Sequence, residues 1–177
     1  LYLGYVKSKL SDDKGAIEAF NKYIEVNPDY FGAYNNRGYS KSNIGDYAGA
    51  ITDLTKAIEI NPTYAEAYNN RAYCKAKLGE NRSAMIDYDT TIALDSNHSS
   101  AYYNRGLLKA HLHDYKGAIE DCDKAIAIQP KNIYVGKFKA NIADIYFNRG
   151  RYKSVRKEYN SAVNDFDQAI ERSPIFT

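Results

Sequence analysis

One six-residue motif recurs along the chain at a nearly constant interval. "AYNNRG" occupies residues 33–38, and the related segments "AYNNRA", "AYYNRG" and "IYFNRG" begin at residues 67, 101 and 145. The first three copies start 34 residues apart, and the fourth starts 44 residues after the third. The prolines follow the same interval: Pro28, Pro62, Pro130 and Pro174. A 34-residue period is typical of stacked helix–turn–helix units, so it constrains the fold more strongly than composition does.

A 34-residue unit with its proline at position 32 brings equivalent residues into columns. The units are 1–30 (lacking its first four positions), 31–64, 65–98, 99–132 and 143–176. Residues 133–142 remain as a ten-residue insertion, which we expect to lengthen a first helix that Asn132 caps. Within each unit we expect a helix A at about positions 2–14 and a helix B at about positions 18–30. Position 8 is always small, which predicts close contact between the two helices: Gly4, Gly38, Ala72, Gly106 and Gly150.

The segment "AYNNRGYSKSNIGDYAGAITDLTKAIEINP" at residues 33–62 resembles the tetratricopeptide repeat family, with tyrosine where the family usually has tryptophan. The resemblance extends over nearly the whole chain. It implies an all-α fold, a right-handed α-solenoid of helix–turn–helix repeats forming a single array over residues 1–177. It also implies a role in protein interaction, because the concave face of such arrays usually holds an extended peptide or a partner helix against the A helices.

Two columns of opposite charge change together between units. Position 7 is arginine and position 23 is aspartate in four units, whereas the first unit has Leu3 and Ala19. We therefore predict four structural ion pairs within the units: Arg37–Asp53, Arg71–Asp87, Arg105–Asp121 and Arg149–Asp165. Position 11 is lysine in every unit, and we expect its stem to lie beside the same aspartate. The alternative is that the arginines bind an anionic ligand.

Positions 6, 9 and 13 lie on the side of helix A that faces away from helix B on a helical wheel. The candidate peptide-groove residues at these positions are Asn36, Asn70, Asn104, Asn148, Tyr5, Tyr39, Tyr73, Leu107, Arg151 and Lys77. An amide side chain donates and accepts at once, so a ladder of asparagines could hold the backbone of an extended peptide. The alternative is that each asparagine bonds to the adjacent A helix and only sets the packing of the repeats.

Charge and motif content narrow the class of partner. The formal net charge is +2, so the sequence does not favour nucleic acid or a membrane as the partner. Residues 131–157 carry eight lysines and arginines against Asp144 alone, which makes them either a docking patch for an acidic partner or a solvated basic face. No catalytic set, cofactor motif or metal-ligand cluster is recognisable, so we predict no enzyme activity, no cofactor and no metal.

Three roles remain open from the sequence. The first is a non-catalytic protein–protein interaction scaffold that binds a peptide segment or partner helix. The second is the repeat arm of a larger enzyme or of a secretion or assembly protein, because both ends of the chain read as cut. The third is a homo-oligomer formed through uncapped ends, since the terminal repeats of solenoids need polar capping surfaces for solubility.

Overall fold

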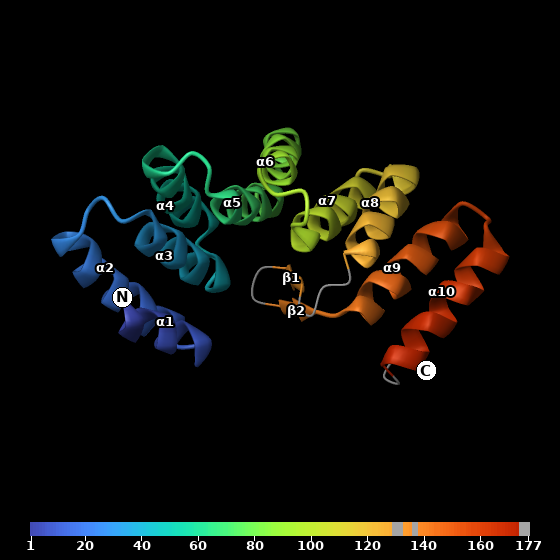
Figure 1. Ribbon diagram of the computed structural model, residues 1–177, viewed down its shortest axis with the longest axis horizontal. Coiled ribbons are helices and arrows are strands. Elements are labelled where there is room, and N and C mark those ends of the chain that lie inside the picture. The colour runs from blue at the N-terminus through green and yellow to red at the C-terminus, as the bar shows by residue number, and fades with distance from the viewer. Residues whose placement is uncertain (129–132, 136–137, 174–177) are drawn as a thin grey trace. The chain divides into compact units, whose positions relative to one another are not determined.

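The computed structural model describes residues 1–128, 133–135 and 138–173, which form a helical repeat solenoid with one small β-hairpin (Figure 1). The elements are α1 (Tyr2–Lys9), α2 (Asp13–Val26), α3 (Phe31–Asn43), α4 (Tyr47–Ile60), α5 (Ala65–Lys77), α6 (Asn81–Leu94), α7 (Ser99–His111), α8 (Tyr115–Ala127), β1 (Ile133–Val135), β2 (Phe138–Ala140), α9 (Ile142–Val155) and α10 (Tyr159–Arg172). The chain divides into two compact units: Leu1–Asp95, with α1 to α6, and Ser96–Thr177, with α7 to α10 and the hairpin. None of the described helices is both long and apolar enough to cross a membrane.

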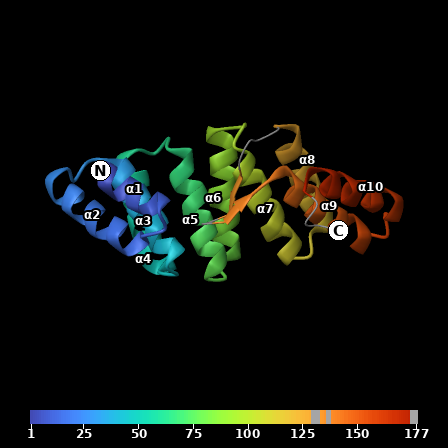
Figure 2. The same ribbon diagram turned by 90° about the horizontal axis from the view of Figure 1, so that it is seen from below.

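Each repeat contains one antiparallel pair, an A helix followed by a B helix (Figure 2). The A helices are α1, α3, α5, α7 and α9, and the B helices are α2, α4, α6, α8 and α10. The turn within a pair is short: residues 44–46 connect α3 with α4. Because so short a turn folds the second helix back along the first, each helix buries one stripe of its surface against its partner.

The start of three B helices is fixed by an aspartate cap. Asp12, Asp46 and Asp114 each accept a hydrogen bond from the backbone N–H three residues later, at 2.9 Å. The residue that donates is glycine in all three repeats, because a Cβ at that position would clash with the capping carboxylate. The other two B helices follow Glu80 and Glu158, have serine at the donor position, and lack such a cap. The cap residue and its glycine therefore change together within one chain.

Small residues on α3 let the large side chains of α4 reach the core of the first unit. Gly38 lies so close to α4 that an added Cβ would come within 2.9 Å of Leu54 Cγ. Ala50, Leu54 and Ala57 on α4 are completely buried. The small residues at position 8 therefore allow a spacing between the two helices that a larger side chain would prevent.

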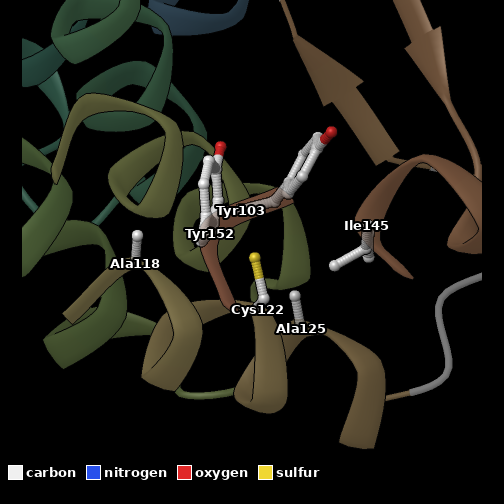
Figure 3. Close-up of a cluster of buried hydrophobic side chains, with 6 residues drawn as sticks. All are labelled: Tyr103, Ala118, Cys122, Ala125, Ile145 and Tyr152. Carbon is white, nitrogen blue, oxygen red and sulfur yellow. The ribbon is translucent and has the colours of Figure 1, made fainter. Parts of the chain in front are cut away.

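The second unit packs differently at the junction between its two repeats. Position 24 of helix B is large in the other repeats, as Phe20, Leu54, Tyr88 and Phe166 show, but α8 has Cys122 there. The adjacent α9 carries Ile145 and Tyr152 at positions 3 and 10, where the other A helices have smaller residues. In Figure 3, Cys122 and Ala125 point toward these two side chains, and all four are buried in one cluster. At this junction the large side chains therefore come from the A helix of the next repeat, and they fill the core space that a large residue of the B helix fills in the other repeats.

The insertion at 133–142 does not lengthen a helix, so that expectation is wrong. Within it, β1 and β2 pair antiparallel, with Ile133 opposite Ala140 and Val135 opposite Phe138. Both strands lie in the second unit, where β1 contacts α7 and β2 contacts α9. Branched and aromatic residues such as those of "IYV" favour extended backbone over helix, which accounts for the difference.

A capping box starts α9 after the insertion and keeps this helix close to the length of the other A helices. The Asn141 side chain accepts hydrogen bonds from the N–H groups of Ala143 and Asp144, and the Asp144 carboxylate accepts one from the Asn141 N–H. This reciprocal arrangement satisfies backbone donors at the first turn and fixes the helix start. Asn132, which we expected to be the cap, lies outside the described residues.

The glycine column makes a prediction about stability. We expect Gly38→Ala to lower the free energy of unfolding by about 1–3 kcal/mol, because its Cβ would meet Leu54 Cγ at 2.9 Å. Gly106→Ala should cost less, since its nearest contacts are the Asp121 Cβ at 3.2 Å and the Ala118 carbonyl oxygen at 3.3 Å, and alanine favours the helix. Urea unfolding followed by circular dichroism measures both variants. Equal losses at the two sites would contradict the packing argument.

Candidate functional site

The structure brings each of the four predicted arginines onto its predicted aspartate. In all four repeats arginine Nε donates to Asp Oδ2 at 2.8–2.9 Å, and Nη2 donates to Asp Oδ1 at 2.5–2.8 Å. Such a bidentate contact matches the planar guanidinium and fixes its orientation. The aspartate side chains are at most 5% exposed and those of the arginines 14–17%. These arginines are therefore bonded to carboxylates inside the array.

The lysine column at position 11 joins the same aspartates. Lysine Nζ lies 2.8–2.9 Å from Asp Oδ2 in these four repeats: Lys41, Lys75, Lys109 and Lys153. Each buried carboxylate is thus shared by two cations of helix A. In the first repeat, where the aspartate is replaced by Ala19, Lys7 instead pairs with Asp12 at 3.2 Å.

The arginine also reaches the preceding repeat, a contact that the sequence columns did not predict. Its Nη1 donates to the side chain at position 25 of the previous B helix: Arg37 to Asn21 at 2.8 Å, Arg71 to Thr55 at 3.1 Å, and Arg149 to Asp123 at 2.6 Å. Each of these arginines consequently links helix A to its own helix B and to the previous one. For Arg149, burial opposes the charge, but its bonds to Asp165 and Asp123 outweigh this, so its pKa is raised.

The tyrosine column at position 4 stacks on the same arginines. The guanidinium carbon lies 5.1–5.6 Å from the ring centroid in the four pairs Arg37–Tyr34, Arg71–Tyr68, Arg105–Tyr102 and Arg149–Tyr146. A cation over an aromatic face is attracted by the ring quadrupole. This contact gives tyrosine a specific role at position 4 in addition to filling space.

Two of the predicted groove asparagines bond to the adjacent A helix. Asn70 Nδ2 on α5 donates to Asn35 Oδ1 on α3 at 3.1 Å. Asn148 Nδ2 on α9 donates to the Tyr103 hydroxyl on α7 at 2.6 Å. Both contacts connect position 6 of one repeat with position 5 of the previous repeat, as the structural alternative requires.

The exposure of the asparagines also differs along the column. Asn104 is only 3% exposed, so its amide is not presented to solvent. Asn36 is half-buried and accepts from Asn35 Nδ2 at 3.3 Å. At Asn70 and Asn148, position 6 therefore contributes to the packing of the A helices.

In the first unit, the face of the A helices turned away from the B helices carries aromatic rings with nearby lysines. Tyr5 is 50% exposed, and Lys9 Nζ lies 5.3 Å from its ring centroid. Lys77 Nζ lies 5.3 Å from the ring centroid of Tyr73, which is half-buried, as is Tyr39. Burial raises the pKa of Tyr73 to about 12. This face offers apolar area edged by cations.

In the second unit, a hollow of about 460 Å³ opens on the same face of α7 and α9. Its lining comprises Leu107, Ala110, His111, Tyr115, Asn148, Arg151, Tyr152, Ser154, Val155 and Phe166. Three of these, Leu107, Asn148 and Arg151, are predicted groove residues. In the first unit, the corresponding helices α3 and α5 contact each other directly. We call the feature the α7–α9 hollow.

The basic segment at 131–157 is more neutral than its sequence indicates. Arg149 and Lys153 both pair with Asp165, and Arg156 Nε lies 2.6 Å from Glu158 Oε1. Arg151 is exposed and donates to an amide oxygen, that of Asn148, at 3.3 Å. Lys131 and Lys137 lie outside the described residues. The charge of the described part is thus concentrated at few positions.

The two cysteines are packing residues. Both are free and buried, and burial raises the pKa of Cys74 and of Cys122 to about 12. Their thiols are therefore protonated at neutral pH and are poor nucleophiles. Within the part of the chain that the structure describes, no three His, Cys, Asp or Glu side chains gather where they could hold a metal ion.

Comparisons with known proteins match this architecture. Four family models described as tetratricopeptide or TPR repeats match residues 99–132, 43–79 and 19–52 and, for the fourth, both 3–30 and 65–98. The crystal structure of MamA is similar over 97% of this chain and 95% of its own, with 26% identity and a TM-score of 0.80. YrrB, described as a TPR protein with an unusual peptide-binding site, is similar over 97% of this chain and 83% of its own, with 18% identity and a TM-score of 0.70. The search of curated protein sequences gave no match.

The shared aspartate predicts strong coupling between its partners. We expect Arg71→Leu or Asp87→Ala alone to lower the free energy of unfolding by about 3–5 kcal/mol. Asp87→Ala leaves the half-buried Arg71 and Lys75 without their carboxylate, and Arg71→Leu leaves the buried Asp87 with Lys75 as its remaining cation. The double variant should cost clearly less than the sum of the two, and denaturant unfolding of all three variants measures this difference. The exposed pair Lys116–Glu120, whose closest nitrogen and oxygen are 4.0 Å apart, is the control and should couple by only about 0–1 kcal/mol. Additive losses at Arg71 and Asp87 would rule out the coupling.

The asparagine contacts make a separate prediction. We expect Asn70→Ala to lower the free energy of unfolding by about 1 kcal/mol, because it removes the hydrogen bond to Asn35, which is 4% exposed. Asn164→Ala, at an exposed position of α10, should leave stability unchanged or raise it, since alanine is the better helix former. Thermal unfolding of the two variants tests this. If Asn70→Ala behaves like the control, the asparagine has no structural role.

Proposed function

This chain belongs to the tetratricopeptide repeat family of protein-interaction scaffolds, and we propose that it is a non-catalytic member that binds a protein segment on the exposed face of its A helices. The α7–α9 hollow carries the proposal, because residues singled out from the repeat columns line a concave surface there. Its volume lies within the usual range for binding clefts, about 300–1,000 Å³. Of the residues that line the hollow, Tyr115 and Phe166 come from B helices and the others from α7 and α9.

The chemistry of the A-helix face favours a polypeptide over a small charged ligand. Tyr5, Tyr39 and Tyr73 supply large rings that lose little rotamer freedom on binding, and the hollow adds aliphatic and aromatic side chains. The arginines at position 7, for which anion binding was the alternative role, pair with aspartates, which removes the main support for an anionic small ligand. YrrB, which has the same fold, is a TPR protein with a peptide-binding site, and this precedent agrees with a polypeptide ligand.

The proposal predicts where a bound peptide is crosslinked. Peptides selected by display against the whole chain should crosslink to benzoylphenylalanine placed at Lys77 or Val155, both exposed on A helices. The same photoreactive residue at Ile86 or Val163, which are 59% and 56% exposed on B helices, is the matched control and should give little product. Mass spectrometry of the crosslinked peptides measures the yields. Equal yields from the two sets would contradict binding on the A-helix face.

A further inference from the structure

The α7–α9 hollow has an apolar floor and a polar rim. Leu107, Tyr115, Tyr152 and Phe166 are buried or half-buried and form the floor. The rings of Tyr115 and Tyr152 lie 6.3 Å apart between centroids, so they make a continuous aromatic surface. An apolar floor of this kind gains most from a bulky apolar side chain that leaves water to occupy it.

The rim carries a positive charge on Arg151. His111 and Arg151 are exposed at the edge of the hollow, and its ten lining residues include no aspartate or glutamate. Three other cations on α9 or just after it have carboxylate partners: Asp165 for Arg149 and Lys153, and Glu158 for Arg156. Arg151 instead donates to the amide oxygen of Asn148, a neutral acceptor, at 3.3 Å. A carboxylate on a partner would make a stronger, charge-assisted hydrogen bond with this guanidinium.

We propose that the α7–α9 hollow binds a partner segment in which an aromatic or leucine side chain stands next to an aspartate or glutamate. The apolar side chain occupies the floor and the carboxylate pairs with Arg151 at the rim. Arg151 and Tyr152 both line this hollow, so adjacent residues of the partner can reach the rim and the floor together. This inference names the partner chemistry for one part of the A-helix face and so rests on the proposed function.

The packing of the second unit explains why this hollow arises here. Tyr152 and Ile145 are larger than their counterparts on the other A helices, and they pack over the small Cys122 of α8. The contact between neighbouring A helices also lengthens, from the Asn70–Asn35 amide pair in the first unit to Asn148 on the far end of the Tyr103 side chain. A longer spacer between α7 and α9 leaves room for a side chain from outside.

Short capped peptides test the proposal on the whole chain. The probe is acetyl-Gly-Phe-Asp-Gly-amide, with Phe-Lys and Ala-Asp versions as matched peptides, each titrated while backbone amide NMR shifts are followed. We expect the Phe-Asp peptide to bind about tenfold more tightly than either other peptide, with shifts confined to α7, α9, Tyr115 and Phe166. Arg151→Glu should reverse the preference toward the Phe-Lys peptide, whereas Lys157→Glu, the same charge change outside the lining, should not.

A second pair of variants tests the apolar part of the lining, to which Val155 belongs. Val155→Glu should abolish binding of the Phe-Asp peptide, and Val163→Glu on α10 should not, although the two valines are 58% and 56% exposed. Circular dichroism checks that each variant folds. Equal binding of Phe-Asp and Phe-Lys, or no binding of any of the three, would overturn the inference. Shifts confined to α3 and α5 would also overturn it while leaving the proposed scaffold function intact.

Discussion

The rest of the structure depends on a buried aspartate that two cations share. In each of four repeats, the carboxylate on helix B accepts from an arginine and a lysine of helix A, and the arginine stacks on a tyrosine one turn earlier. A buried carboxylate is tolerated only with such partners. Because three of the arginines also reach the previous B helix, the interaction that closes a repeat also joins it to its neighbour. Folding of one repeat is thereby coupled to folding of the next.

Around these fixed contacts the apolar core is free to vary. The first unit fills its core with large B-helix residues such as Leu54 and Tyr88, whereas the second unit uses Tyr152 and Ile145 from helix A over a small Cys122. Both arrangements leave the arginine–aspartate geometry unchanged, at 2.5–2.8 Å between Nη2 and Oδ1. On the surface, the second arrangement is accompanied by a hollow of about 460 Å³ on the A-helix side.

The repeat columns explain how much could be read from the sequence. Each column shows the residues that occupy the same structural environment in successive repeats. The first repeat has Leu3 and Ala19 where the other four have arginine and aspartate, and this joint replacement indicated that the arginine and the aspartate pair. A helical wheel places Asn70 on the side of α5 away from its own helix B, but it does not show which residue of the neighbouring A helix lies there. The hydrogen-bond partner, Asn35 on α3, therefore could not be predicted. The hairpin occurs once and so has no column. The sequence does contain a sign of the changed packing beside the hollow, because Cys122 is unusually small at position 24 and Tyr152 unusually large at position 10. Finding it requires comparing position 24 of one repeat with position 10 of the next.

The hairpin at 133–140 has a consequence for how such arrays diversify. Ten extra residues entered between two repeats without disturbing the capped start of α9 or the ion pair of its repeat. Loops after a B helix are thus places where new sequence can be grafted while the stacked helices keep their contacts. A protein engineer could exchange this segment to change the surface beside α7 and α9 while the stacked helices stay the same.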